Sequence, residues 1–396
     1  MKKLLVLGDG YLQTTIIKRA KEMGLYVIAC DMTLGNPGEK LADRFYNVST
    51  TDFDAVLKIA EEEKIDGILT YASDVSAPTV SYVAEKMGLP CNPYQTVNIM
   101  THKDLFHPFL KQNNFLIPKS AVVESEEDIR NFFDSVQGSI MIKPTDSSAS
   151  RGVNRIDRPE DISTYFEEAK KYSRSKTIVV EEFIQRKGYQ VAGDAFVVDG
   201  QVAFFGLANE HFDETCNPFV PIGESFPSVI TESQRNKAKQ KVQEALSILK
   251  YKDGAVNLDF MFDSNDEVFI IELGPRNGGN LITDAILLSN GVDLAECTIK
   301  AALGEDNSAL VDKPMERCIS SYVWHSTKDG VFDQLLLSDE LQKRVVRNDM
   351  FVLKGQPIYR YRNGSFGLGF ALIEYDNVDQ MTYMMDHMNE YYRVKC

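Results

Sequence analysis

Two acidic residues stand on consecutive predicted strands at a spacing that suits a metal ion. Apolar and polar residues alternate along residues 256–262 and along the first part of residues 268–279, which predicts an antiparallel hairpin. Asp259 and Glu272 are the acids on these two strands. Carboxylate oxygens suit Mg²⁺, which takes few protein ligands and completes its shell with water and substrate phosphates. The hairpin therefore predicts a metal–nucleotide site, with Mn²⁺ as the alternative ion.

The register of this hairpin decides whether the two acids meet. If Asp263 pairs with Val268, Asp259 lies opposite Glu272, and Ile271 faces the other side of the sheet. Directly opposed Cβ atoms lie about 5 Å apart, where like charges repel. A divalent cation is the simplest way to relieve that repulsion.

A serine-rich loop follows another predicted strand, Ile140–Pro144, and its small residues let backbone N–H groups turn toward a phosphate. The hydroxyls of Ser147, Ser148 and Ser150 add donors, and Lys143 stands at the end of the strand. The loop lacks the GK[ST] of a Walker A motif. A surface loop with an incidental lysine is the alternative interpretation.

Two further cations have positions that suit anion binding. Lys103 falls in the first turn of a helix predicted over residues 101–112 with Thr101 as its N-cap, where the helix dipole favours an anion over a cation. A solvated lysine explains the same pattern equally well. Arg276 stands just before Asn277, Gly278 and Gly279 and a predicted helix at residues 281–289, which is typical of a backbone-rich anion site. A turn with a surface salt bridge is the alternative interpretation.

Other patterns are weaker. Residues 181–184 (EEFI) end a strand whose backbone could hold a nucleotide base, although packing explains them as well. The segment after the first strand resembles a dinucleotide fingerprint, but Gln13 replaces its third glycine, so we expect no NAD there. The five histidines have no metal spacing, and Cys216 has no base nearby in sequence, so neither a histidine metal site nor a thiol nucleophile is predicted.

Phe226 and Pro227 are candidates for an acceptor pocket or for packing.

Composition limits the class of protein. The net charge of −15 argues against nucleic acid or an anionic membrane as the main partner, and no segment approaches the roughly 20 apolar residues of a membrane span. The six cysteines are scattered without a CxxC motif, which fits a reducing compartment. We therefore expect a cytoplasmic protein of two or three domains.

Strands and helices alternate over the first 90 residues, which predicts a parallel, doubly wound sheet. Prolines and turn residues at 89–96 mark a boundary. Further along, Thr231 and Gln234 form a capping box at the start of a helix over residues 231–250, and a hairpin is predicted from Gln190–Val198 and residues 202–207. The last 85 or so residues mix strand and helix.

Taken in order, these motifs resemble the ATP-grasp superfamily, in its carbamoyl-phosphate synthetase-like and biotin-carboxylase-like branch of carboxylate–amine ligases. The resemblance implies a mixed α/β and α+β chain. A Rossmann-like domain (residues 1–95) would precede an ATP-grasp domain (96–306) with a small lid at about 120–185. A C-terminal α+β domain (307–396) would complete the unit.

The resemblance also implies roles. Residues implied in ATP binding are Lys103, Lys143, Ser147, Ser148, Ser150, Arg151, Gly152, Glu181, Glu182, Ile184 and Gln190. Asp259 and Glu272 would bind Mg²⁺. Arg276, Lys143 and Glu272 would be catalytic, and the substrate carboxylate would meet Arg276, Asn277, Gly278 and Gly279. Two departures stand out, since Gly274 replaces a frequent asparagine metal ligand, with Asn257 as a substitute, and Ala149 replaces a common loop glycine.

The expected reaction joins a small carboxylate, such as an amino acid, to an amine through an acyl phosphate, releasing ADP and phosphate. Its partners would be small molecules, and the resemblance leaves homodimerisation open. Three alternatives stay open: a carboxylase or formate-using enzyme of the purine-pathway type, an ATP-binding protein without turnover, and an NAD-dependent oxidoreductase.

Overall fold

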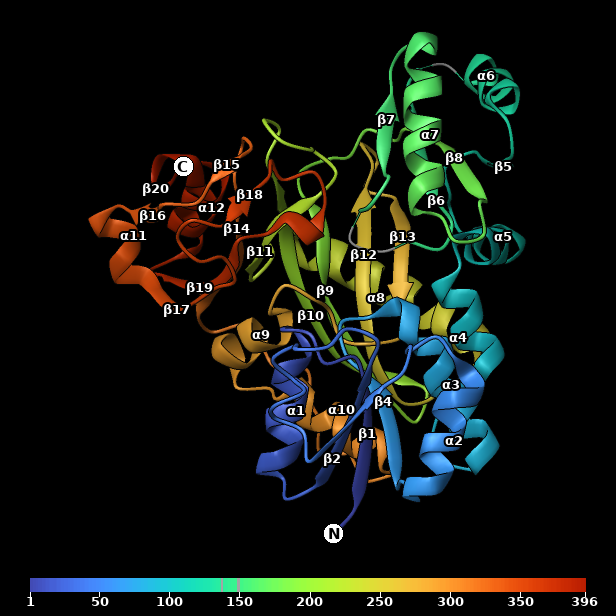
Figure 1. The fold of residues 1–396 in the computed structure, drawn as a ribbon. Coiled ribbons are helices and arrows are strands. Elements are labelled where there is room, and N and C mark those ends of the chain that lie inside the picture. The colour runs from blue at the N-terminus through green and yellow to red at the C-terminus, as the bar shows by residue number, and fades with distance from the viewer. Residues whose placement is uncertain (137, 148–149) are drawn as a thin grey trace.

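The computed structural model describes residues 1–136, 138–147 and 150–396 (Figure 1). The N-terminal part is a parallel four-stranded sheet in the order β3-β2-β1-β4, as the strand–helix alternation predicted. The half-exposed strand β3 was not predicted. The elements are β1 (Lys3–Leu7), α1 (Gln13–Glu22), β2 (Tyr26–Asp31), β3 (Arg44–Asn47), α2 (Phe53–Glu63), β4 (Gly67–Thr70) and α3 (Ala77–Met87).

Two helices, α4 (Tyr94–Thr101) and α5 (Lys103–Gln112), lead out of this part. The prediction of Thr101 as an N-cap is wrong, because Thr101 ends α4 and its hydroxyl donates to the Val97 carbonyl at 2.9 Å. His102 is the N-cap residue of α5. Lys103 nevertheless opens that helix, as predicted.

A second sheet, antiparallel and four-stranded, has the order β5-β8-β6-β7. Its elements are β5 (Ser120–Val123), α6 (Glu126–Ser135), β6 (Ile140–Pro144), β7 (Asn154–Ile156), α7 (Ile162–Tyr172) and β8 (Ile178–Glu182). Figure 1 shows this small sheet with α6 and α7 projecting beyond the end of the larger sheet. It spans the residues expected to form a lid.

An eight-stranded antiparallel sheet forms the centre of the molecule, in the order β13-β12-β9-β10-β11-β14-β19-β17. Its strands are β9 (Gln190–Val198), β10 (Gln201–Phe212), β11 (Pro221–Phe226), β12 (Gly254–Phe262), β13 (Val268–Gly274), β14 (Cys318–Trp324), β17 (Val345–Met350) and β19 (Gly369–Tyr375). Three of these strands come from the last 80 residues, so the C-terminal region continues the central sheet. The remaining elements are α8 (Glu232–Leu249), α9 (Ile282–Asn290), α10 (Leu294–Ala302), β15 (Gly330–Val331), β16 (Gln334–Leu337), α11 (Asp339–Arg344), β18 (Pro357–Ile358), α12 (Val378–Asp386) and β20 (Tyr392–Lys395).

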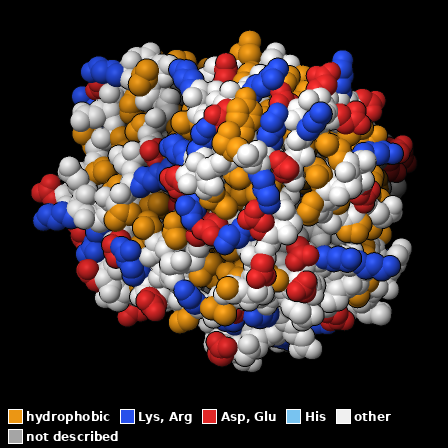
Figure 2. Space-filling view, turned by 90° about the horizontal axis from the view of Figure 1, so that it is seen from below, with side chains coloured by type: hydrophobic (Ala, Val, Ile, Leu, Met, Phe, Trp, Pro, Cys, Tyr) orange, Lys and Arg blue, Asp and Glu red, His pale blue; other side chains and the backbone are white. Residues whose placement is uncertain are grey.

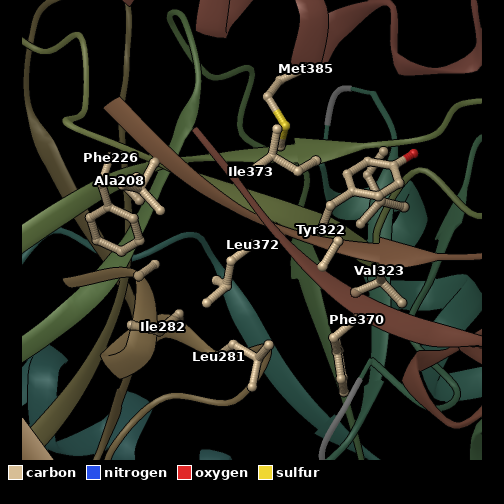
Figure 3. Close-up of a cluster of buried hydrophobic side chains, with 14 of the residues drawn as sticks. Ala208, Phe226, Leu281, Ile282, Tyr322, Val323, Phe370, Leu372, Ile373 and Met385 are labelled. Atoms are coloured by element: carbon tan, nitrogen blue, oxygen red, sulfur yellow. The ribbon is translucent and has the colours of Figure 1, made fainter. Parts of the chain in front are cut away.

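The central sheet is buried on both faces, because alternate residues of β9 enter different cores. Val197 packs in a cluster with α8, whose Thr231–Gln234 capping box is present as predicted. Phe196 packs in a second cluster with β14, β19 and α9, part of which Figure 3 shows. This packing fixes the strands that carry the polar side chains described below.

The exposed surface mixes charges of both signs. Figure 2 shows basic and acidic side chains interspersed over the face seen from below. In the described part of the chain, no helix is both long and apolar enough to cross a membrane.

Candidate active site

The hairpin of β12 and β13 places Asp259 directly opposite Glu272, as predicted. The register toward the turn differs from the expectation, because Phe262 pairs with Val268 and a bulge follows. The bulge leaves Ile271 as an extra residue on β13, so Ile271 lines the same cavity as Glu272 instead of facing the other side.

The two opposed acids are electrostatically unequal. Lys103 Nζ donates to Glu272 Oε2 at 2.9 Å, and Gln190 Nε2 donates to Asp259 Oδ1 at 2.8 Å. Burial raises the pKa of Asp259, and the neighbouring Glu272 carboxylate raises it further. Burial also acts on Glu272, but Lys103, with smaller contributions from Arg276 and Lys143, outweighs it and holds the pKa of Glu272 below its usual range. A cation placed between the two acids would favour the ionised form of both.

A second ion pair lies between the small sheet and α5. Lys143 Nζ lies 2.5 Å from Glu181 Oε2, and His107 Nδ1 lies 3.3 Å from Glu181 Oε1. Burial opposes ionisation of Glu181, yet Lys143 and His107 together hold the pKa of that carboxyl below its usual value. Burial lowers the pKa of His107. Glu181 therefore orients Lys143.

One cavity of about 1830 Å³ brings most of the predicted residues together. They come from α5, the small sheet and the central sheet, which are distant in sequence. The predicted residues that line it are Lys103, Lys143, Ser147, Ser150, Arg151, Glu181, Glu182, Ile184, Gln190, Asp259, Glu272, Arg276 and Gly279. Asn257, the proposed substitute ligand, also lines the cavity and pairs across the strands with Gly274.

Some predicted residues have other positions. Gly152 has φ +75°, and a Cβ there would lie 3.0–3.1 Å from Pro144, Ala169 and Tyr172, so this glycine packs against α7. Ser148, like Ala149, lies outside the described residues.

Asn277 and Gly278 do not form the open anion site expected of them. The Gly278 N–H donates to both oxygens of the buried Asp194 carboxylate at 2.9 Å. Asn277 is fully buried and accepts a hydrogen bond from Thr298 at 2.7 Å. The described residues that line the cavity include neither of them. Asp194 thus occupies the backbone donor that the sequence assigned to a substrate.

Arg276 has a partner that sequence reasoning missed. Its Nε and Nη2 donate to the two oxygens of Asp74, at 2.8 and 2.5 Å, and both side chains are nearly buried, at 11% and 12% exposed. Asp74 follows β4 of the N-terminal part and also lines the cavity. Two parts of the chain therefore hold the guanidinium in one bidentate geometry.

Two further buried acids, Glu210 and Glu224, were also missed. They oppose each other directly on β10 and β11, and Gln190 donates to Glu210 at 2.7 Å as well as to Asp259. Burial raises the pKa of Glu224 to about 7, against hydrogen bonds from Ser321 and Asn280. Burial, followed by Asp259 and Glu224, raises the pKa of Glu210. A row of acids thus runs across the central sheet along the cavity. The polar residues that continue β10 beyond its predicted end at residue 207 are the sequence feature that could have revealed these acids.

The structure also gives the positions of Gln13 and Phe226, two residues discussed from the sequence. The Gln13 side chain packs beside Gly8 and Gly10, and its amide reaches the Tyr71 carbonyl at 2.5 Å, so it fills the space at this strand-to-helix turn. Phe226 is fully buried in the core, and the described cavity lining contains neither it nor Pro227. Packing is therefore the role of Phe226.

Comparison with known proteins gives one family match and several relatives. Residues 108–289 match the family model of the ATP-grasp domain. A formate-dependent phosphoribosylglycinamide formyltransferase of Methanocaldococcus jannaschii is 27% identical over 390 residues, covering 96% of this chain and 93% of that protein. An L-amino acid ligase structure from Bacillus licheniformis has a TM-score of 0.84 and 20% identity, covering 100% of this chain and 98% of that one. A phosphoribosylglycinamide synthetase structure from Anaerococcus prevotii has a TM-score of 0.76 and 22% identity, covering 100% and 99%.

Proposed function

We propose that the chain is a ligase that uses ATP and Mg²⁺ and couples ATP cleavage to joining a small carboxylate with an amine. The match of residues 108–289 to the ATP-grasp domain supports this proposal. The observation that carries the proposal is the opposed Asp259–Glu272 pair in one cavity with Lys103, Lys143 and Arg276. This set supplies acids for a metal, cations for phosphates and a guanidinium for a carboxylate.

The residues present fit the metal and the nucleotide. Asp259 is half-buried opposite another acid, and among the described residues its side-chain hydrogen-bond partner is the Gln190 amide, with no cation paired to it. Asp259 and Glu272 would hold Mg²⁺, which when bound neutralises charge on the transferring phosphoryl group. Lys103 and Lys143 are the cations that would meet the phosphates, and Glu181 keeps Lys143 aimed into the cavity.

Arg276 is placed to hold the substrate carboxylate. A carboxylate oxygen would attack the γ-phosphorus, and ADP would leave. The amine nitrogen would then attack the acyl carbon, inorganic phosphate would leave with that oxygen, and the amine would lose a proton. Arg276, fixed by Asp74, would stabilise negative charge on the carboxylate and on the tetrahedral oxyanion. The loop that includes Ser147 and Ser150 would exclude water, since an acyl phosphate hydrolyses.

Formate is the donor that the relatives support best. The matched relative from M. jannaschii is named for formate and for phosphoribosylglycinamide, and formate is itself a small carboxylate. The cavity exceeds the roughly 300–1,000 Å³ of an ordinary ligand site, as a site for ATP and a second large substrate would. Basic side chains line its distal wall, where they would pair with an anionic group on the acceptor: Lys328, Arg360, Arg362 and Arg393.

An amino-acid ligase is the second candidate. The observation in its favour is the TM-score of 0.84 to an L-amino acid ligase over the whole chain. In that case Arg276 would hold an amino-acid carboxylate, and the buried acids Glu210 and Glu224 would face an ammonium group. Both candidates share the activation step and differ only in donor and acceptor.

The test is Mg²⁺-dependent ADP release by the purified protein with ATP and two substrate sets. One set contains formate with phosphoribosylglycinamide, and the other contains pools of L-amino acids. We expect release that requires formate and phosphoribosylglycinamide together, with labelled formate entering the product. Release with amino acids alone would favour the second candidate, and tight ATP binding without release in any pool would refute both.

Variants separate the site from the fold. Glu272→Ala and Arg276→Ala should each abolish ADP release. Each variant should still show a cooperative melting transition, as a folded protein does. Glu61→Gln, on the exposed face of α2, is the matched control for a lost carboxylate. Near wild-type release from either site variant would contradict the assignments.

A further inference from the structure

Three side chains that the proposed reaction does not use converge on another wall of the cavity. A ring nitrogen of His325, the Sγ of Cys216 and a carboxylate oxygen of Asp213 lie within 4.8 Å of one another. Asp213 and Cys216 follow β10, and His325 follows β14. In the sheet, β10 and β14 lie two and four strands from β12, on the order of 10 and 20 Å at about 4.8 Å per strand, so this cluster is separate from Asp259 and Glu272.

The turn that carries two of these residues is held in place before any ligand binds. Asp213 Oδ1 accepts from the Thr215 N–H at 2.8 Å and from its hydroxyl at 2.6 Å, which leaves Oδ2 directed at His325. Arg360 Nη2 donates to the Thr215 carbonyl at 2.6 Å. Asp213 and Cys216 therefore belong to a turn that is already held in place.

The hydrogen bonds of His325 fix which nitrogen faces the cluster. Nδ1 lies 2.9 Å from the Val323 carbonyl oxygen, which can only accept, and 3.3 Å from the Tyr392 hydroxyl, which can accept as well as donate, so Nδ1 carries a proton. A neutral ring then presents the lone pair of Nε2 to Asp213 Oδ2, 2.9 Å away. Two acceptors at that distance repel unless a cation lies between them or the ring takes a second proton. The buried His325 is thus prepared as a metal ligand, with its other nitrogen oriented by the backbone.

The same geometry disfavours a thiol nucleophile. A Cys–His–Asp triad needs the acid on one ring nitrogen and the thiol on the other. Here the backbone occupies Nδ1 and Asp213 occupies the Nε2 side, so no second nitrogen remains for Cys216.

We propose that Asp213, Cys216 and His325 bind a borderline divalent cation of the Zn²⁺ class, with a fourth position open to the cavity. Nitrogen, thiolate and carboxylate ligands suit Zn²⁺, and three protein ligands with an open position are typical of sites that bind a further molecule. With Zn²⁺–ligand distances of about 2.0–2.3 Å, tetrahedral ligand atoms lie roughly 3.3–3.7 Å apart, so the side chains would shift by about 1 Å or less. The Cys216 thiol would release its proton to solvent on binding.

The test uses Co²⁺ as a spectroscopic probe on the full chain in excess Mg²⁺, which saturates the Asp259–Glu272 site. We expect one equivalent of Co²⁺ to bind with a thiolate-to-cobalt charge-transfer band, and Zn²⁺ to displace it. Cys216→Ser should remove the band, whereas Cys91→Ser, which removes an exposed thiol elsewhere, should keep it. Asp213→Asn should weaken Co²⁺ binding at least tenfold.

Melting curves without metal test whether each variant is folded. Cys216→Ser, at a half-buried position, is the variant least expected to disturb the fold. Absence of the band in the wild type, or its persistence in Cys216→Ser, would overturn the proposal. A doubly protonated His325 ring in metal-saturated protein, seen by nitrogen NMR, would show an imidazolium–carboxylate pair in place of the site and would also overturn it.

Discussion

Glu224 provides the sharpest quantitative prediction, because burial makes its ionisation costly. The side chain is 2% exposed, and its pKa lies at about 7 against an ordinary value of 4.5. Ser321 donates to it at 2.6 Å and Asn280 at 3.0 Å, and these bonds offset only part of the burial. We predict that Glu224→Gln changes the stability of the protein with a sign that depends on pH.

The sign follows from proton counting. In the unfolded chain Glu224 loses its proton near pH 4.5, and in the folded chain near pH 7. The folded form therefore holds more protons between these values, and its stability falls by about 1.4 kcal/mol per pH unit, or about 3 kcal/mol in all above pH 7. Glutamine never ionises and escapes this loss. Its NH₂ faces the Asn280 amide at a cost of about 1 kcal/mol, so we expect Glu224→Gln to be about 2 kcal/mol more stable than wild type at pH 8 and slightly less stable at pH 5.

Urea unfolding at pH 5 and pH 8, without nucleotide or divalent cation, measures the difference. Trp324 is the single tryptophan, is fully buried and lies on the same strand as Ser321, so its fluorescence reports this part of the sheet. Glu61→Gln, at an exposed position, is the control and should follow wild type at both pH values. An equal difference at pH 5 and pH 8, or a less stable Glu224→Gln at pH 8, would refute the reasoning.

Three further predictions concern the site. Asp259→Asn should keep the fold and lower Mg²⁺-dependent ADP release at least about 10³-fold, because one of two opposed metal acids is lost; release within tenfold of wild type would contradict this. Asp74→Asn should lower the rate of ADP release about 10²–10³-fold and raise the KM for the carboxylate while ATP affinity stays unchanged, since Arg276 loses its charged partner; unchanged KM and kcat would show that Asp74 does not position Arg276. Lys103→Met should raise the pKa of Glu272, because the lysine is the main group that offsets the burial of this carboxylate. Mg²⁺ binding, measured by calorimetry, should therefore weaken at pH 6 and recover above pH 8. An equal loss of Mg²⁺ affinity at both pH values would contradict this.

The sequence correctly predicted those features that depend on the spacing of residues close together in the chain. Alternation along two strands placed Asp259 opposite Glu272, and the strand–helix alternation predicted the parallel N-terminal sheet. The bulge was not predictable, because inserting Ile271 on the cavity side keeps the two acids opposed and changes only the register toward the turn. The N-cap at Thr101 failed for a similar reason, since a second short helix ends where the predicted one would begin.

Contacts between distant segments could not be predicted from one chain. Asp74 and Arg276 are 202 residues apart, and Asp194 and Gly278 are 84 apart. Nothing in the local sequence around Arg276 indicates an acid from the N-terminal sheet, and the glycine-rich turn at Gly278 has the same pattern whether a substrate or Asp194 accepts its N–H. Asp213, Cys216 and His325 meet only because β11 and β14 are neighbours in the sheet.

The contacts of Glu181 with Lys143 and with His107 have a mechanical consequence. Lys143 and Glu181 lie on adjacent strands of the small sheet, whereas His107 belongs to α5. If the small sheet turns as a unit, the Lys143–Glu181 pair moves with it, and the 3.3 Å contact between His107 and Glu181 opens or closes together with the hydrogen bond from the Lys103 N–H to the Thr145 carbonyl. The NMR chemical shifts of the His107 ring would therefore report the position of the small sheet relative to α5, without any attached label.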